Sequence, residues 1–359
     1  MKHLLKASII LLLLTTFFIS PMNGQNLPDH INKAGITPAA DSADRNNNFY
    51  DNTETYSLPC NDLEIAGEIE NPGKVDFSKL QKHSVIVKET ILKADGKDSF
   101  VGAYRYDGYS LFDILSDRIL KKQNAAEFKP IIDLYVEIEN DKGEKVIMSW
   151  GEIYYPNFLQ NSIIATSVSR IVPSKSKDLW PLPMVSKLVI ATDLITERNL
   201  SNPVKITVKS YHRSIPVNRD LTPLFSDEFK IFDNEKEVET ITARPKNLRD
   251  QTVHTIFYGR GRGIHSTQPF TGVYLKDLLS PHLMTDKTNL QKCIVVLVGK
   301  DGYRSVYTCS EIMNRNDQSE VLLVPCEEEK DGGKFRIFPA CDFFSDRAVK
   351  ALSEIRIVH

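Results

Sequence analysis

The sequence predicts an α+β protein built from two tandem copies of one fold. The second half of the 359-residue chain repeats spacings of the first half in the same order. A repeat of about 150 residues is the size of a whole domain and far too long for a solenoid unit. Short apolar stretches typical of strands are interspersed with a few short helical patterns, largely without βαβ spacing. This favours short mixed strands with short helices over a doubly wound sheet.

Three blocks carry the repeat. The first is an aromatic-x-Gly-x-x-Leu-x-Asp-aliphatic-Leu motif, and the other two are a Gly–Glu pair and an Asp–Arg–Ile triplet at fixed separations. The matched positions are Tyr106–Leu115 with Phe270–Leu279, Gly143 and Glu152 with Gly302 and Glu311, and Asp193, Arg198 and Ile206 with Asp342, Arg347 and Ile355. Three matched blocks in one order are hard to obtain by chance, so the function is sought in the repeated fold.

The N-terminus has the pattern of a secretory signal peptide. Lys2 and Lys6 flank the start of an apolar stretch from Ala7 to Ile19, which Pro21 ends. That stretch is too short to span a bilayer. We therefore predict a signal peptide over residues 1–24 and an exported protein, periplasmic or secreted, with no membrane span after cleavage. The alternative is an uncleaved N-terminal anchor. Residues 25–57 are polar and are predicted to be a disordered tether.

The two predicted domains cover residues 58–212 and 213–359. In the first, alternating apolar residues predict strands, a serine or aspartate before an apolar turn predicts each helix start, and the turn Asn140–Gly143 predicts a hairpin. Expected strands are 63–69, 84–90, 135–139, 145–148, 163–165, 187–191 and 204–208, and expected helices are 76–80, 110–120 and 149–153. In the second, expected strands are 229–231, 253–257, 294–298, 303–307, 320–324 and 355–357, with a helix at 274–279.

Composition and charge narrow the function. Hydrophobic residues make up 41% and charged residues 26% of the chain, and the formal net charge is -2. These values are ordinary for a globular protein, and they provide no basic field for nucleic acid. The five cysteines are Cys60, Cys293, Cys309, Cys326 and Cys341. No Cys-x-x-Cys pair is present, which argues against a structural zinc site, whereas a disulfide in the second half can form in an oxidising compartment.

Each repeat resembles the molybdopterin-binding domain of the sulfite oxidase type. The second copy carries the resemblance best, through Phe270–Leu279, the hairpin Asp301-Gly302-Tyr303, Glu311-Ile312, and Phe335–Pro339 with Arg347. The first copy contributes Tyr106–Leu115, Gly143, Glu152-Ile153 and Leu188–Ile190. The resemblance implies the family's fold for about residues 60–359. These are largely scaffold motifs, so they are informative about fold and weak for activity.

The departures from that family concern its metal chemistry. The family's metal is held by a cysteine thiolate, a soft ligand for a soft centre. The corresponding windows are Val85–Ala103 and Val253–Pro269, and neither contains a cysteine. No cofactor is therefore expected, and we predict a non-catalytic scaffold that binds a small anionic ligand or an envelope protein partner. The alternative is a divergent molybdopterin-dependent oxidoreductase with altered ligation.

The candidate site is a glycine-rich basic loop at the position of the family's cofactor loop. Its sequence is Tyr258-Gly-Arg-Gly-Arg-Gly-Ile-His265. Glycines leave backbone N–H groups approachable, and two arginines offer paired donors to a carboxylate or phosphate. We predict that Arg260, Arg262 and His265 border the main concave site of the second half and bind a small anion. The alternative is a solvated surface loop that binds nothing.

Three other groups of residues are predicted to stabilise the fold. Asp193 with Arg198, and Asp342 with Arg347, are predicted to form ion pairs before the last strand of each half. Glu152 and Glu311 are predicted to cap helix starts. The aromatic run Trp150, Tyr154 and Tyr155 is predicted to pack in the core, with a ligand-stacking surface as the alternative.

Overall fold

A computed structural model of the chain describes residues 49–326 and 332–359. The predicted signal peptide and residues 25–48 of the predicted tether lie outside the described residues. The described part belongs to one compact unit. The division into domains at residues 58–212 and 213–359 stays a prediction.

The predicted α+β class is wrong, because the protein is mostly β, with 42% strand and 11% helix. Four larger sheets have an arrangement like the four blades of a β-propeller, and not that of tandem sulfite-oxidase-type domains. The helices are shorter than expected. The one expected at 110–120 spans only Leu111–Leu115, with Ser110, the last residue of strand β5, as its N-cap and Ser116 as its C-cap.

Two sheets belong to the first half. One has the order β1-β8-β5-β4, with β9 also paired to β8, and the other has the order β3-β2-β10-β6-β7. Their strands are β1 (Thr55–Ser57), β2 (Glu64–Gly67), β3 (Gly73–Lys74), β4 (Lys82–Leu92), β5 (Asp98–Ser110), β6 (Leu134–Asn140), β7 (Lys145–Ser149), β8 (Ser162–Arg170), β9 (Lys187–Ile190) and β10 (Pro203–Ser210). Strand β1 lies within the last residues of the predicted tether, where it pairs with β8.

The second half has two larger sheets and a separate hairpin. The sheet orders are β12-β11-β21-β17-β18 and β13-β16-β19-β20, and β14 pairs with β15 alone. The strands are β11 (Phe229–Asp233), β12 (Lys236–Ile241), β13 (Gln251–Val253), β14 (Phe257–Gly259), β15 (Gly263–Ser266), β16 (Phe270–Tyr274), β17 (Ile294–Gly299), β18 (Arg304–Thr308), β19 (Val321–Pro325), β20 (Phe335–Pro339) and β21 (Leu352–Val358).

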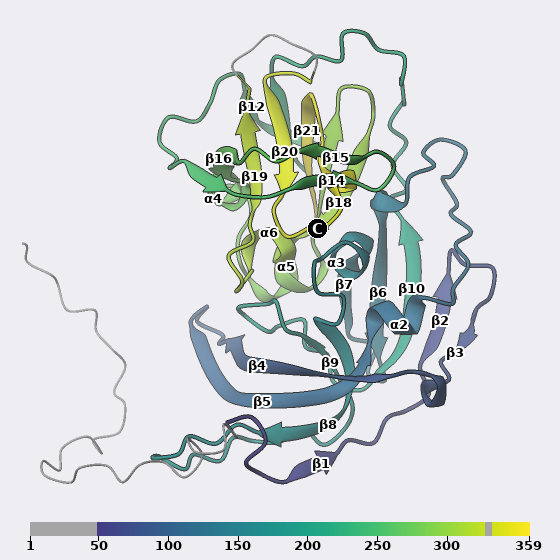
Figure 1. The fold of residues 1–359 in the computed structure, drawn as a ribbon, viewed down its shortest axis with the longest axis vertical. Coiled ribbons are helices and arrows are strands. Elements are labelled where there is room, and N and C mark those ends of the chain that lie inside the picture. The colour runs from purple at the N-terminus through teal and green to yellow at the C-terminus, as the bar shows by residue number, and fades with distance from the viewer. Residues whose placement is uncertain (1–48, 327–331) are drawn as a thin grey trace, which may run out of the picture. The chain divides into compact units, whose positions relative to one another are not determined.

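The helices are short. The α-helices are α2 (Leu111–Leu115), α3 (Trp150–Tyr154), α4 (Leu275–Leu279), α5 (Lys287–Lys292) and α6 (Cys309–Met313), and the 3-10 turns are η1 (Phe77–Lys79), η2 (Ile131–Asp133) and η3 (Ser345–Arg347). Helix α3 contacts β18 and helix α5 contacts β7, so helices of each half pack on strands of the other. Figure 1 shows α3, α5 and α6 in the middle of the ribbon, where the two halves meet.

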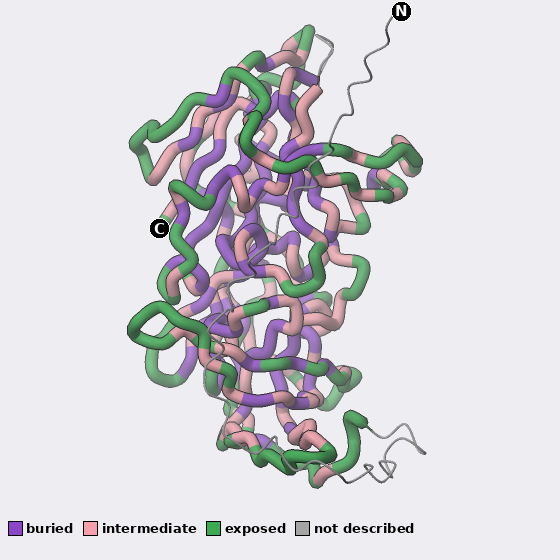
Figure 2. The backbone as a smooth tube through the Cα atoms, turned by 90° about the vertical axis from the view of Figure 1, so that its left-hand side faces the viewer, coloured by how far each residue is buried: buried purple, intermediate pink, exposed green. Residues whose placement is uncertain are grey.

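The two halves share one pairing scheme. Strand β10 is parallel to β2 and antiparallel to β6, and strand β21 is parallel to β11 and antiparallel to β17. Likewise, β5 pairs with β8 and β8 with β9, as β16 pairs with β19 and β19 with β20. Each half has its own apolar core of buried side chains. Figure 2 shows the buried segments mainly in the interior and many of the exposed ones in loops at the periphery.

The glycines of the repeated motif occupy equivalent places. A Cβ on Gly108 would lie 2.1 Å from the carbonyl oxygen of Ile164 in β8, and one on Gly272 would lie 2.3 Å from that of Leu323 in β19. Contacts of this length are sterically forbidden, so each glycine lets the neighbouring strand come close. The motif is therefore a strand-packing motif that leads into helix α2 or α4.

We expect Gly272→Ala to lower the free energy of unfolding by about 1–3 kcal/mol, because the added methyl group collides with backbone that can move only with its sheet. Denaturant unfolding measures this. Gly261→Ala is the matched control, since a Cβ there would meet no heavy atom within 4 Å. Equal stability of the two variants would contradict the close approach.

Candidate functional site

The basic loop forms the tip of the β14–β15 hairpin. Gly259 ends β14, and a Cβ there would lie 2.3 Å from Nε2 of His265, so the glycine makes room for the histidine ring. Gly263 begins β15 with a φ of 75°, a left-handed conformation that favours glycine. Arg260, Gly261 and Arg262 connect the strands and are exposed. The glycines thus shape the hairpin and its packing.

Of the three predicted anion-binding residues, one lines a cavity and two do not. His265 lines a large cavity, whereas Arg260 and Arg262 are not among the residues that line it. The side chain of Arg260 is 52% exposed, and its Nε lies 3.3 Å from Oδ1 of Asp346. Anion binding by these three residues stays a prediction. The geometry supports it for His265 more than for the two arginines.

The cavity has a volume of about 560 Å³ and lies in the second half beside the hairpin. One wall is aromatic. The rings of Phe270 and Phe338 stack at 4.1 Å, and Phe257 meets them edge-on at 5.2 and 5.8 Å. Phe270 is the aromatic residue of the repeated motif, so the cavity lies against that motif. A volume in this range fits a small organic molecule.

A second part of the lining, called the cationic wall, is made of basic side chains. Arg219, Arg336 and Lys350 line it together with one carboxylate, Asp301. Nη1 of Arg219 lies 3.2 Å from Oδ2 of Asp301, and its guanidinium stands 4.7 Å from the centre of the Tyr303 ring. Burial raises the pKa of the Tyr303 hydroxyl, which therefore stays protonated and donates to the Asp346 carbonyl. Lys350 is exposed and, among the described residues, has no ion-pair partner.

The cationic wall comes from residues that the sequence did not single out as a site. Arg219 lies in the connection between the halves, Arg336 in β20, and Lys350 just before β21. They are more than a hundred positions apart at the extremes, and no spacing links them. They become neighbours only in the folded chain. Of Arg260, Arg262 and His265, which the glycine-rich loop indicated, only His265 lines this cavity.

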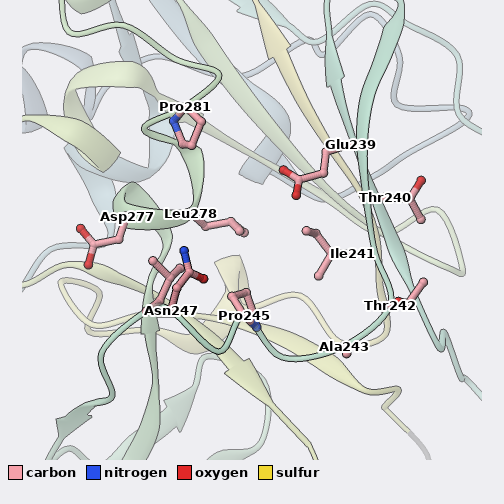
Figure 3. A pocket seen from close by; sticks show the side chains of 11 residues that line it. Glu239, Thr240, Ile241, Thr242, Ala243, Pro245, Asn247, Asp277, Leu278 and Pro281 are labelled. Carbon is pink, nitrogen blue, oxygen red and sulfur yellow. The ribbon is translucent and has the colours of Figure 1, made fainter.

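A second cavity of about 320 Å³ lies between β12, the segment after it and α4. Ile241 and Leu278 face each other across it, and Glu239 stands at its side (Figure 3). Its ionisable lining groups are the carboxylates Glu239 and Asp277, and Glu239 already accepts from His282 at 2.7 Å. No basic side chain lines this cavity to attract an anion, so it does not fit the predicted anion site.

The predicted ion pair of Arg198 belongs to a buried cluster where the halves meet. Its side chain is 1% exposed and makes paired contacts to Asp193 at 2.7 and 2.9 Å and to Glu152 at 2.8 and 3.0 Å. Its Nη1 also donates to the hydroxyl of Thr308, 3.1 Å away in the other half. The structural reading of this pair is confirmed.

Arg347 forms the counterpart in the second half. It contacts Asp342 at 2.6 and 2.8 Å and Glu311 at 2.7 Å, and it donates to the hydroxyl of Ser149 at 3.2 Å. Ser149 and Thr308 are the N-caps of α3 and α6, and Glu152 and Glu311 complete the two capping boxes, as predicted. Each arginine therefore binds the capping glutamate of its own half and the capping hydroxyl of the other half. We call these two groups the arginine clusters.

The aromatic run after Ser149 packs inside the protein. The rings of Trp150 and Tyr154 stack at 4.5 Å, and Trp150 and Tyr155 are buried. Packing, and not a ligand-stacking surface, is what these contacts provide.

Metal-ligating side chains do not gather within residues 49–326 and 332–359. No group of three or more His, Cys, Asp or Glu side chains is arranged there to hold a metal ion. In the same residues, no helix is long and apolar enough to cross a membrane. The cofactor prediction is not tested by these observations.

Comparison with known proteins adds no family. Neither a protein-family model nor a curated protein matches this chain. The aromatic and cationic lining of the larger cavity is therefore the main guide to function.

Proposed function

We propose that the protein is a non-catalytic binding protein whose second half takes up a small organic anion. The observation that carries the proposal is the cavity of about 560 Å³, which is lined by three cationic side chains, one carboxylate and three phenylalanine rings. The N-terminal apolar stretch supports export, so the ligand would be met outside the cytoplasm.

The two walls define the ligand class. The cationic wall favours a carboxylate or phosphate, which Arg219 and Lys350 can approach from the cavity side. The aromatic wall favours a flat apolar body, because the Phe257, Phe270 and Phe338 rings offer surface that water does not satisfy. A ligand with both parts, such as an aromatic acid or a phosphorylated aromatic alcohol, matches the cavity better than a bare inorganic ion.

We expect Lys350→Ala to weaken the binding of phenyl phosphate about tenfold, since a charge-assisted hydrogen bond contributes roughly 1.5–3 kcal/mol. Isothermal titration calorimetry measures this. Lys300→Ala is the matched control, because Lys300 is also exposed and does not line the cavity. Wild-type affinity should fall with added salt, as expected for a partly exposed ionic contact.

The ligand series separates the two walls. Phenyl phosphate should bind more tightly than inorganic phosphate, and benzyl alcohol should bind more weakly than either. The double variant Arg260→Ala, Arg262→Ala tests the hairpin. If it weakens binding as much as Lys350→Ala, the hairpin arginines reach the ligand. No measurable binding of phenyl phosphate, or equal binding by Lys350→Ala and Lys300→Ala, would contradict the proposal.

A further inference from the structure

Two of the free cysteines lie directly opposite each other at the end of a strand pair. Strands β17 and β18 are antiparallel, and Ile294 is paired with Thr308. One position further, Cys293 ends helix α5 as its C-cap, and Cys309 begins helix α6. The backbone N–H of Cys309 donates to the carbonyl of Cys293 at 2.9 Å, which continues the register.

This placement matches the geometry of a disulfide. Directly opposed residues of antiparallel strands have Cα atoms about 4.5–5.5 Å apart, and disulfides join Cα atoms about 4.4–6.8 Å apart. Opposed side chains also point to the same face of the sheet. Here both are 2% exposed or less within the core of the second half, and the Cys293 thiol donates only a long contact of 3.6 Å to the carbonyl of the next residue.

The other three thiols have different neighbours. Cys60 donates to the Asn61 carbonyl at 3.4 Å, and Cys341 donates to Oδ1 of Asp342 at 3.3 Å. Among the described residues, no hydrogen bond joins Cys60, Cys326 or Cys341 to another thiol. All five cysteines are free thiols in the structure, and the geometry selects one pair.

We propose that Cys293 and Cys309 are the site of an intramolecular disulfide, formed when the chain folds in the presence of a disulfide oxidant. One cysteine thiolate attacks a sulfur of the oxidant, releases one of its thiols and leaves a mixed disulfide. The second cysteine thiolate then attacks the protein sulfur of that mixed disulfide and releases the other oxidant thiol. The protein loses two electrons and two protons, and the oxidant is reduced to two thiols.

The cross-link would act on the contact between the halves. Cys309 directly follows Thr308, whose hydroxyl accepts from Arg198 of the first half. A bond from Cys309 to Cys293 ties the start of α6 to the end of α5, so it holds the capping hydroxyl of that arginine cluster in place. Export, which the N-terminus predicts, would bring the chain to a compartment in which such bonds persist.

The test uses the full chain, refolded with oxidised and reduced glutathione, denatured, and alkylated with N-ethylmaleimide before intact-mass and peptide analysis. With oxidised glutathione, we expect three alkylated cysteines and a linked peptide pair containing Cys293 and Cys309, and under reduction we expect all five to be alkylated. The oxidised chain should melt roughly 3–8 °C higher, since the bond closes a short loop.

Variants identify the pair. Cys293→Ser should show four alkylated cysteines under both conditions, whereas Cys60→Ser, the control, should keep the link and show two under oxidation. Five alkylated cysteines in the oxidised wild type, or a linked peptide with any other pair, would overturn the proposal. If Cys293→Ser fails to fold, the peptide analysis of the wild type still shows which two cysteines are linked.

Discussion

Replacing Arg347 by Ala should lower the free energy of unfolding by about 3–5 kcal/mol, the usual cost of removing one partner from a buried charge network. The arginine is fully buried, and without it the carboxylates of Asp342 and Glu311 would remain in the interior with their countercharge gone. The variant also removes the donor to Ser149 in the other half. Equilibrium denaturant unfolding measures the loss.

The matched control is Arg262→Ala, which removes an exposed guanidinium and should change stability by less than about 0.5 kcal/mol. A triple replacement of Arg347, Asp342 and Glu311 by apolar residues of similar size should be milder than Arg347→Ala alone, because no buried charge is left unpaired. A loss below about 1 kcal/mol for Arg347→Ala would mean that water reaches the cluster, and the arrangement described here would be wrong.

The arginine clusters show what the sequence could reveal and what it could not. The pairing of Arg198 with Asp193, and the capping role of Glu152, are local and follow from spacings of a few residues. The hydrogen bond from Arg198 to Thr308 joins residues 110 positions apart, in different halves. A residue pattern along the sequence cannot predict this contact, because the contact depends on how the two folded halves pack against each other.

The fold class failed for a related reason. Strands β4 and β5 are 11 and 13 residues long and pair along most of their length. A strand was expected at 84–90, within β4, but none was expected at β5, where charged residues and glycines interrupt the apolar pattern and sheet pairing stabilises the strand. Short helical patterns therefore weighed too heavily in the prediction.

The repeated glycines, by contrast, could be found in the sequence because one steric requirement, close approach of a neighbouring strand, acts at both copies.

The candidate site was found in part. His265 lines the cavity, and the glycine-rich loop in the sequence predicted it as a site residue. Lys350 and Arg219 lie in connections that are far apart in the sequence, and only the fold gives them a shared cavity. Charge patterns in a sequence identify local clusters, so a site assembled from distant segments escapes them.

Wild-type protein should become less stable as the pH rises from about 4.5 to about 7 because of Glu152. Burial, opposed by Arg198 and assisted by the nearby charges of Glu311 and Asp193, raises the pKa of Glu152 from 4.5 to about 7. The folded state therefore holds this proton more tightly than the unfolded state does. Its contribution to stability is fully present below pH 4.5 and is lost as the pH rises through about 7, with a magnitude on the order of 2–3 kcal/mol.

Glu152→Gln is the variant that isolates this effect, because the amide oxygen can still accept from the backbone N–H of Ser149 in the capping box. Denaturant unfolding of both proteins between pH 4.5 and pH 8 gives the comparison. Burial also raises the pKa of Asp342, and that contribution is common to both proteins and cancels in the difference. The stability of the wild type relative to Glu152→Gln should fall as the pH rises. A difference that is flat with pH, or that grows in favour of the wild type, would show that Glu152 is ionised throughout and that Arg198 outweighs its burial.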